Sequence, residues 1–313
     1  MADRPIVILA EPIEASPRAW LADRVDLREL APGEAGFDQA LAVAHGIVIR
    51  TATRIDVDLL EAAPCLLAVA RAGVGLDGID QSACRERGIA VLNTPDANTQ
   101  AVVEFVIASV THALRPRDRV NEPLDRQQWQ AMRASDRASI QMDQLTFGVL
   151  GFGRIGSRVA EVASVIGFRV LFHDLLDIPA SRHGAATPVG MEELLGESDV
   201  LSIHVDGRAS NRHLLDSRRL ELLRRSVLLV NASRGFVIDE EALAAHLRAT
   251  PSMRVILDVH DTEPVPPGSP MLGLPNATLH PHIAARTRTG LLNMGWVVRD
   301  LLEHVKVASR SPA

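Results

Sequence analysis

A glycine-rich turn between an apolar run and an amphipathic run constrains the fold of this chain more than any other feature. The turn has the spacing G-x-G-x-x-G, with its glycines at Gly151, Gly153 and Gly156. The apolar run 146–150 precedes it, and 157–167 has the pattern of an amphipathic helix. A second apolar run, 168–172, ends just before Asp174. This order of strand, turn, helix, strand and acid predicts a dinucleotide-binding βαβ unit, whereas the spacing alone would also fit an ordinary glycine-rich turn.

Each glycine has a physical role in such a unit. Gly151 permits the tight turn, Gly153 lets the backbone approach a pyrophosphate, and Gly156 allows the helix to pack closely on the strand. The first amides of the helix face the anion with the favourable end of the helix dipole. Asp174 stands near the position, about 20 residues after the glycines, that is expected of a ribose-binding carboxylate.

Length and composition narrow the class of protein. At 313 residues the chain exceeds the size at which one core usually keeps growing, so we expect two domains. A net charge of −6 gives no footprint for nucleic acid, and no apolar run approaches the length of a membrane span. The start lacks the pattern of a signal peptide. Cys65 and Cys84 lack the spacing of a disulfide framework or a zinc site. We therefore expect a cytoplasmic protein without a metal and without a nucleic-acid or membrane partner.

Short apolar runs alternate with helical patterns along the whole chain. The predicted strands are 5–10, 46–50, 66–71, 89–93, 146–150, 168–172, 199–205, 226–231, 253–258 and 277–280. The main predicted helices are 37–44, 56–63, 99–114, 157–167 and a single final helix over 287–306. Continuous runs of Val, Ile and Leu are typical of parallel strands buried on both faces. The pattern predicts an α/β fold with two series of parallel strands.

Polar residues directly after such strands are the best site candidates, because parallel sheets bind ligands beyond the carboxyl ends of their strands. By this criterion the candidates are Arg71, Asp174, His204, the turn 231–235, Asp258, Glu263 and His282.

Arg234, Glu263 and His282 together supply the chemistry of hydride transfer to a carbonyl. A nicotinamide carries the hydride, so the protein must orient the carbonyl and give a proton to the developing alkoxide. An imidazole suits the proton, a nearby carboxylate favours its charged form, and a guanidinium can hold a substrate carboxylate with two hydrogen bonds. Taken singly, the arginine also fits a surface ion pair and the glutamate a solvated loop. Spacing does not decide between His280 and His282.

Several segments in order resemble the D-isomer-specific 2-hydroxyacid dehydrogenase family, and most closely its phosphoglycerate dehydrogenase branch. They are RAGVGLDGID (71–80), NTPDANTQAVVEF (93–105), GFGRIG (151–156) with Asp174, NASRGFVIDEEAL (231–243), LDVHDTEP (257–264) and HPHIAARTRTG (280–290). The resemblance implies Arg234, Glu263 and His282 as the catalytic trio. It favours His282, which follows Pro281, over His280.

The resemblance also implies the architecture and the cofactor. It implies two doubly wound parallel-sheet domains, with a Rossmann NAD-binding domain (98–286) inserted into a flavodoxin-like substrate domain (1–97 and 287–313) and the active site in the cleft between them. It further implies a homodimer formed through the NAD-binding domain. Two leucines follow Asp174, and a carboxylate there repels a 2′-phosphate, so we expect NAD rather than NADP. The alternative is that Arg182 folds back to meet such a phosphate.

The resemblance assigns individual contacts by position. Cofactor contacts fall on Gly151, Gly153, Arg154, Ile155, Gly156, Asp174, His204, Val205, Ala232, Ser233, Asp258, Ala284 and Ala285. Substrate contacts fall on Arg50, Val74, Gly75 and Arg234. The chain departs from the family pattern at 141–145 and at 206–207, and His260 occupies a position where an aromatic residue is common.

The expected substrate is a small D-2-hydroxyacid, with 3-phosphoglycerate first, because 48–56 resembles the phosphoglycerate branch. Arg50 and Arg54 would meet the phosphate, although both also fit surface charges at a strand end and a helix start. Without a regulatory domain after residue 313, we expect a short form of the enzyme. Reduction of hydroxypyruvate or glyoxylate is one alternative, and a dinucleotide-sensing, corepressor-like binding protein is another. The formate-oxidising branch of the family carries glutamine at the position of Glu263, so Glu263 argues against formate oxidation.

Overall fold

A computed structural model describes residues 4–117, 119–134 and 140–308. The chain forms two compact units, of which unit 1 comprises Met1–Ala101 with Ala285–Ala313 and unit 2 comprises Val102–Ala284. Each unit contains one sheet whose strand pairs are all parallel. Two parallel-sheet α/β units confirm the predicted fold class. Among the described residues, no helix is long and apolar enough to cross a bilayer.

Unit 1 contains a five-stranded sheet in the order β2-β1-β3-β4-β5, which is the flavodoxin-like order. Its strands are β1 (Ile6–Leu9), β2 (Asp26–Glu29), β3 (Gly46–Ile49), β4 (Ala68–Arg71) and β5 (Ala90–Leu92). Its helices are α1 (Ala15–Ala22), α2 (Phe37–Leu41), α3 (Val57–Glu61), α4 (Gln81–Glu86), α11 (Arg288–Gly295) and α12 (Val298–Ala308). Strand side chains alternate between two separate apolar clusters, so both faces of the sheet are buried.

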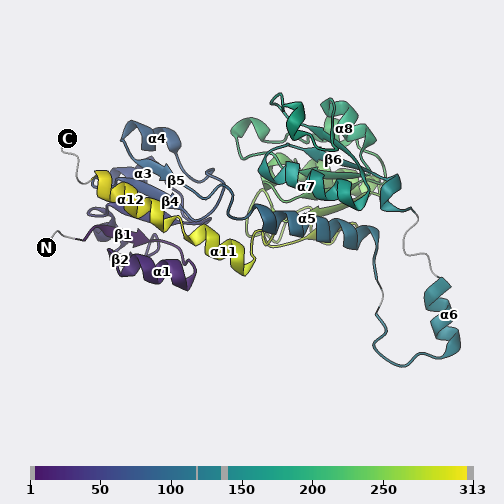
Figure 1. Ribbon diagram of the computed structural model, residues 1–313, viewed down its shortest axis with the longest axis horizontal. Coiled ribbons are helices and arrows are strands. Elements are labelled where there is room, and N and C mark those ends of the chain that lie inside the picture. Colours follow the sequence, from purple (N-terminus) through teal and green to yellow (C-terminus); the bar gives the residue numbers. More distant parts are fainter. Residues whose placement is uncertain (1–3, 118, 135–139, 309–313) are drawn as a thin grey trace. The chain divides into compact units, whose positions relative to one another are not determined.

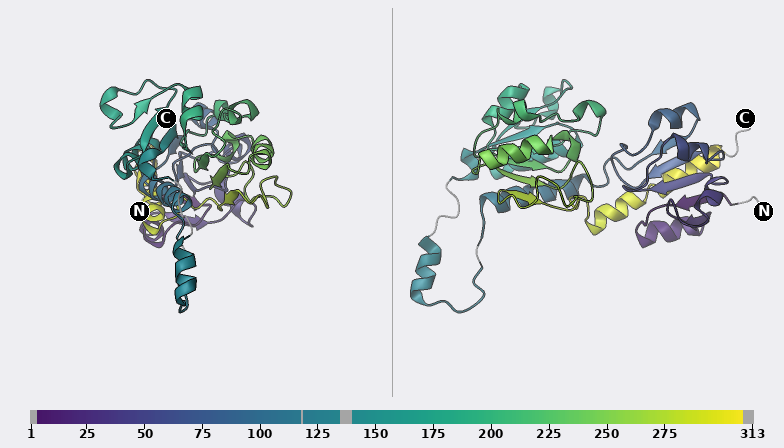
Figure 2. Two further views of the ribbon diagram at one scale, coloured as in Figure 1. Left: turned by 90° about the vertical axis from the view of Figure 1, so that its right-hand side faces the viewer. Right: turned by 180° about the vertical axis from the view of Figure 1, so that it is seen from behind.

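The C-terminal helix α12 packs on the sheet of unit 1, beside the N-terminal elements (Figures 1 and 2). A Cβ atom at Gly46, the first residue of β3, would lie 3.0 Å from Leu301 of α12, so the missing side chain permits this close approach. The prediction of a single helix over 287–306 is wrong, because α11 ends at Gly295. There the backbone lies so close to Pro17 of α1 that a Cβ atom would come within 2.7 Å of its ring.

Unit 2 contains a seven-stranded sheet in the order β12-β11-β10-β9-β6-β7-β8. Its strands are β6 (Thr146–Leu150), β7 (Arg169–His173), β8 (Thr187–Pro188), β9 (Val200–Ile203), β10 (Leu228–Asn231), β11 (Arg254–Leu257) and β12 (Ala277–Leu279). Its α-helices are α6 (Arg126–Ala134), α7 (Arg154–Ile166), α8 (Met191–Glu197), α9 (Ser217–Leu220) and α10 (Glu240–Ala249), while α5 (Thr99–Leu114) runs from unit 1 into unit 2. Its 3-10 turns are η1 (Met142–Gln144), η2 (Ala180–Arg182), η3 (Ala209–Asn211) and η4 (Gly235–Val237). The strand order is that of a Rossmann sheet.

The register of unit 2 brings the strand ends into line. Leu150 of β6 pairs with His173 of β7 and with Ile203 of β9, which in turn pairs with Asn231 of β10. Asn231 pairs with Leu257 of β11. Residues that directly follow these strands therefore lie along one edge of the sheet. Strands β6 and β9 flank the point at which the order reverses, where such sheets bind their ligands.

Two strands were missed by the sequence patterns, and both lie at sheet edges. Strand β2 has the sequence DLRE with no buried residue, and β8 consists of two exposed residues. An edge strand with little buried surface carries no apolar run, so hydrophobic patterning has no signal to detect.

Candidate active site

The glycine turn after β6 has the backbone that a pyrophosphate site requires. Gly151 has a φ of +92°, a conformation that glycine adopts without steric cost. A Cβ atom there would lie 2.7 Å from the carbonyl carbon of His204, and one at Gly156 would lie 2.0 Å from the carbonyl oxygen of Gly151. A Cβ atom at Gly153 would meet nothing within 4 Å. Gly151 and Gly156 thus permit close packing. Gly153 leaves open space at the start of α7, where the N-terminus of a helix favours an anion.

Asp174 follows β7, and its carboxylate lies at the same turn. One oxygen accepts a hydrogen bond from the backbone N–H of Phe152 at 2.6 Å, and the other accepts one from Leu176 at 2.9 Å. A carboxylate oxygen can accept more than one hydrogen bond, so a ribose hydroxyl can still donate to it. The turn and Asp174 therefore fit the adenosine diphosphate half of a dinucleotide.

Arg208 is a cation close to Asp174 that sequence reasoning missed. Its guanidinium donates to both carboxylate oxygens of Asp206, at 2.7 and 2.6 Å. The hydrogen bond to Asp206 raises the pKa of Arg208, and the charges of Asp206 and Asp174 raise it further. The sequence analysis considered only Arg182 as a cation near Asp174. Arg208 is 34 residues further along the chain and comes near Asp174 only because β7 and β9 lie in the same sheet.

His204 follows β9 and has a structural setting. Its backbone N–H donates to the carbonyl of Leu150 at 2.7 Å, and its ring Nε2 lies 2.8 Å from the hydroxyl of Ser202. Burial lowers the pKa of His204 to about 3, so the ring is neutral at physiological pH. His204 and the adjacent Val205 can therefore shape this edge of the sheet, but His204 brings no positive charge to a pyrophosphate.

Glu263 and His282 form a hydrogen-bonded pair. Nδ1 of His282 lies 2.8 Å from Oε2 of Glu263. Burial raises the pKa of Glu263, but hydrogen bonds from the His282 ring and the His260 amide, together with nearby positive charge, hold it below its ordinary value. The carboxylate is thus ionised near neutral pH and fixes the imidazole ring, whose Nε2 remains available for proton transfer. A carboxylate that orients an imidazole is a recurring acid–base arrangement.

Asp258 holds the segment that carries His282. Its two carboxylate oxygens accept hydrogen bonds from the backbone N–H groups of Ile283 and Ala284, both at 2.8 Å, and its carbonyl accepts one from His282 at 2.8 Å. Only 1% of Asp258 is exposed, and burial raises its pKa despite these bonds. The resemblance implies cofactor contacts at Asp258 and Ala284, and in the structure the hydrogen bond between them helps to fix the backbone beside His282.

Arg234 follows β10 in a turn that is held by its own side chains. The amide of Asn231 donates to the carbonyl of Arg234 at 2.9 Å, and Ser233 donates to Asn231 through both its N–H and its hydroxyl. The next residue, Gly235, is packed so closely that a Cβ atom would lie 1.9 Å from the carbonyl carbon of His260. The turn 231–235, which includes Ala232, therefore packs against the segment that carries Glu263.

Unit 1 contains the other residues predicted to bind substrate. The carboxylate of Glu11 accepts hydrogen bonds from four successive backbone N–H groups, 50–53, at 2.9 to 3.1 Å. Arg50 donates to the carbonyl of Pro12 at 3.4 Å. Burial lowers the pKa of Arg50, and the nearby charge of Arg286 lowers it further. Arg50 in the loop after β3 and Arg286 just before α11 are therefore neighbouring cations, of which the sequence analysis named only Arg50.

The remaining unit 1 candidates lie after β4 and before α11. The carbonyl of Val74 accepts a hydrogen bond from the side chain of Asn93 at 2.6 Å, which fixes the loop that continues into Gly75. Val74, Gly75 and Ala285 are each partly buried. The sequence analysis did not single out Glu11, because its hydrogen bonds to amides about 40 residues further along the chain form only in the fold.

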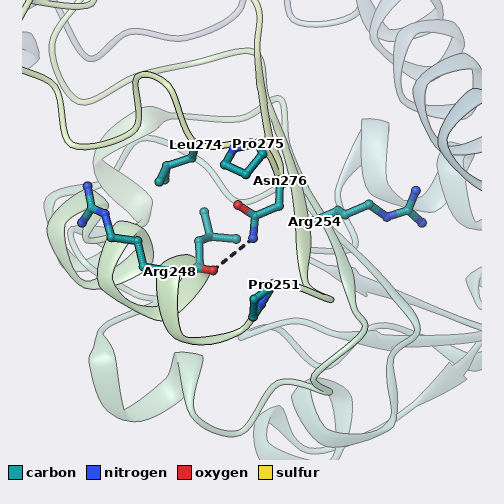
Figure 3. Close-up of a pocket in the computed structure, with 7 residues that line it drawn as sticks. Arg248, Pro251, Arg254, Leu274, Pro275 and Asn276 are labelled. Atoms are coloured by element: carbon teal, nitrogen blue, oxygen red, sulfur yellow. Dashed lines mark hydrogen bonds between the residues drawn. The ribbon is translucent and has the colours of Figure 1, made fainter.

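A pocket of about 390 Å³ lies elsewhere on unit 2, at the start of β11 and the end of α10. Arg248, Arg254, Leu274 and Asn276 are among its lining residues, and the Asn276 amide donates to the carbonyl of Leu247 at 3.1 Å (Figure 3). Arg254 begins the strand that Asp258 follows, so this pocket lies at the opposite sheet edge from the candidate site. Among the described residues, no group of three or more His, Cys, Asp or Glu side chains could hold a metal ion.

Residues 107–284 match the family model of the D-isomer specific 2-hydroxyacid dehydrogenase NAD-binding domain. This match covers more than half of the chain. The chain belongs to the D-isomer specific 2-hydroxyacid dehydrogenase family. The family resemblance predicted from the sequence is thus confirmed.

Individual members of the family show the same relationship. A D-3-phosphoglycerate dehydrogenase from Archaeoglobus fulgidus is 33% identical over 257 residues, which are 82% of this chain and 48% of that protein. A glyoxylate reductase from Aeropyrum pernix is 35% identical over 254 residues, 80% of this chain and 76% of that protein. The chain thus spans about half the length of the phosphoglycerate dehydrogenase relative.

A solved structure extends the similarity to the whole fold. It is an NADPH-dependent glyoxylate/hydroxypyruvate reductase from Sinorhizobium meliloti in complex with NADP and malonate. It has a TM-score of 0.82 and 26% sequence identity, and the match covers 99% of this chain and 95% of that one.

Proposed function

We propose that this chain is an NAD-dependent dehydrogenase that interconverts a small D-2-hydroxyacid and its 2-oxo acid. The observation that carries the proposal is the 2.8 Å contact between Glu263 and His282 at the carboxyl edge of a Rossmann sheet. A bound nicotinamide supplies or accepts the hydride. His282 gives a proton to the carbonyl oxygen in reduction and removes it in oxidation, and Glu263 favours the protonated ring. Arg234 holds the substrate carboxylate.

The cofactor contacts follow from the same edge of the sheet. We assign the pyrophosphate to the turn of Gly151, Gly153 and Gly156 and to the first helical residues, Arg154 and Ile155. Asp174 binds the adenosine ribose. The segments after β9 and β10, and the 284–285 segment, complete the cofactor site. In this proposal unit 1 is the substrate domain and unit 2 is the NAD-binding domain. The domain bounds implied by the resemblance, 1–97 with 287–313 and 98–286, differ from those of the two units by two to four residues.

NAD is our preferred cofactor because the Asp174 carboxylate would repel a 2′-phosphate. Arg208 supports NADP as the alternative, since the charge of Asp174 contributes to the raised pKa of Arg208 and this cation could therefore meet a 2′-phosphate beside Asp174. Initial rates with NADH and NADPH test this choice. We expect kcat/KM to favour NADH by at least about tenfold and Asp174→Ala to narrow that ratio. A wild-type preference for NADPH would reverse the assignment.

We propose 3-phosphoglycerate as the substrate, because a phosphorylated acid needs positive charge beyond the carboxylate clamp. Arg50 and Arg286 bring two such charges together in unit 1, and the D-3-phosphoglycerate dehydrogenase relative gives independent support. Glyoxylate or hydroxypyruvate is the second candidate, supported by the two reductases that the chain resembles.

The deciding experiment is a panel of 2-oxo acids, with NADH oxidation as the readout. Turnover of 3-phosphohydroxypyruvate above that of hydroxypyruvate and glyoxylate would support the first choice, and the reverse order the second. Tight NADH binding without turnover of any acid would contradict the enzymatic proposal and favour a dinucleotide-sensing binding protein.

We also propose that the protein is a cytoplasmic homodimer. Helix α6 has nine residues, none of them buried, and Trp129 within it is 50% exposed. Isolated helices shorter than about 12 residues are marginal in water, so α6 needs a partner surface. A second copy of the chain is our choice of partner, in keeping with the family resemblance. The free thiols Cys65 and Cys84 are typical of a reducing compartment.

A further inference from the structure

His260 lies between the three segments that carry the candidate catalytic residues. It follows β11 and is 8% exposed. Its backbone N–H donates to Oε1 of Glu263 at 3.0 Å, and its ring Nε2 lies 2.8 Å from the carbonyl oxygen of His280. Its own carbonyl group is packed against Gly235, where no Cβ atom would fit. One residue thus touches the Glu263 loop, the His282 segment and the Arg234 turn.

The ring of His260 has a defined hydrogen-bonding role. A carbonyl oxygen can only accept, so Nε2 carries the proton and donates it to His280. A phenylalanine ring at this position has no N–H or O–H group and would contribute packing alone. The histidine therefore adds a hydrogen-bond donor to the contacts of its ring.

The bond matters because His282 has an unfavourable backbone conformation. Its φ is +54°, in the left-handed region that residues with a side chain rarely adopt. The surrounding structure must hold such a conformation in place. On the C-terminal side, the Asp258 carboxylate binds the amides of Ile283 and Ala284. On the N-terminal side, the His260 ring binds the carbonyl of His280.

We propose that His260 is a positioning residue that holds both members of the proton-transfer pair, Glu263 through its backbone amide and His282 through the bond from its ring to His280. The ring bond is specific to the side chain, whereas the amide bond is available to any residue except proline. Substitution of His260 therefore tests the ring bond alone. The inference rests on the proposed function only for the catalytic role of Glu263 and His282.

The titratable groups around His260 determine how the loss of its ring hydrogen bond would be detected. The titratable groups nearest it along the chain or in contact with it are Asp258, Asp261, Glu263, His280 and His282. If the His280 carbonyl is released, the segment relaxes and the bond between His282 and Glu263 lengthens. The carboxylate then stabilises the imidazolium less, and the His282 ring loses its proton at a lower pH.

The test compares His260→Phe, which keeps a planar ring without the donor, with His260→Gln, whose amide nitrogen can replace Nε2. The first readout is NMR titration of labelled histidine in the protein without substrate, with the His282 signal identified by its loss in His282→Asn. We expect the His282 titration to move to lower pH in His260→Phe and to return toward the wild-type position in His260→Gln. An unchanged titration in His260→Phe would overturn the proposal.

The second readout is steady-state reduction of the best oxo acid. We expect His260→Phe to lower kcat by about three- to tenfold with little change in KM, and His260→Gln to recover most of the loss. Equal impairment of both variants with a normal His282 titration would show a merely structural role and contradict the proposal. An inactive wild-type protein would instead reject the proposed function, and the NMR titration would still decide the role of His260.

Discussion

At the scale of single residues, the candidate site depends on a few hydrogen bonds that hold an unfavourable backbone conformation in place. His282 has a left-handed backbone conformation, and buried Asp258 holds the residues on its C-terminal side. Glu263 and His282 were candidates because polar residues after parallel strands gather at one edge, and the family resemblance favoured His282 over His280. The sequence did not predict that the Asp258 carboxylate binds the amides of Ile283 and Ala284, because every residue except proline has a backbone N–H and the pairing depends on the fold.

Replacing His282 by asparagine removes the group that transfers the proton while keeping a polar side chain of similar reach. We expect kcat for oxo-acid reduction to fall by about 10²- to 10⁴-fold. NADH affinity should stay within about twofold, because the cofactor turn is formed by other segments. Stopped-flow rates and fluorescence titration with NADH measure the two effects. A variant that turns over at the wild-type rate would remove His282 from the proton-transfer role.

Replacing Glu263 by glutamine changes the pH dependence. The hydrogen bonds from His282 and His260 outweigh burial and hold the pKa of Glu263 low, so this carboxylate is charged throughout the neutral range. Its charge favours the imidazolium that reduction requires, and the rate of reduction falls as pH rises and that proton is lost. In Glu263→Gln we expect this fall at lower pH by about one unit. A pH–rate profile that does not move would show that Glu263 has no influence on the protonation of His282.

At the scale of secondary structure elements, hydrophobic patterning located the buried strands and failed where burial is slight. The runs 46–50 and 66–71 became β3 and β4, which are fully buried. The edge strand β2 has no buried residue and was missed. The predicted last helix ends early because α1 packs against Gly295, and single-chain periodicity does not report a tertiary contact of that kind.

The loop after β3 provides a stability test at this scale. Glu11 binds four backbone amides there, and these bonds, despite burial, lower its pKa from the ordinary value of 4.5. A lowered pKa in the folded state stabilises the fold above that value, and the contribution is lost as pH falls. We expect Glu11→Gln to destabilise unit 1 by about 1–3 kcal/mol at pH 7, with a difference that shrinks below pH 4.5.

The measurement uses tryptophan fluorescence during urea unfolding in a Trp129→Phe background, because the remaining Trp20 and Trp296 both lie in unit 1. Glu14→Gln is the matched control, since it removes a nearby carboxylate that makes no capping hydrogen bond. Equal effects of the two variants, or a difference that does not depend on pH, would refute the role assigned to Glu11.

At the scale of the whole molecule, two parallel-sheet units contribute different chemistry. Unit 2 contains the glycine turn, the proton-transfer pair and Arg234, and unit 1 contains the pair of Arg50 and Arg286. The sequence predicted both units, because each has its own series of buried strands. It named Arg50 but not Arg286, because the last part of the chain returns to unit 1 and brings Arg286 to Arg50 only in the folded structure.

Helix α6 gives a prediction about assembly. We expect the protein to sediment as a homodimer and Trp129→Ser to weaken the dimer by at least about tenfold, because a large exposed aromatic side chain is a typical interface anchor. Val307→Ser, which changes an exposed residue of α12 in unit 1, serves as the control. Analytical ultracentrifugation over a concentration series distinguishes the outcomes. A wild-type monomer, or equal dissociation of both variants, would reject α6 as the dimer surface.

The central claim is that His282, oriented by Glu263, exchanges a proton with the oxygen of a 2-oxo acid beside the nicotinamide. A crystal structure with NADH and oxamate, an unreactive analogue of a 2-oxo acid, tests it most directly. The account predicts Nε2 of His282 within hydrogen-bond reach of the oxamate amide-carbonyl oxygen, about 2.6–3.2 Å, and the oxamate carboxylate on Arg234. A bound oxamate whose carbonyl faces any other protein group, with His282 out of reach, would contradict it.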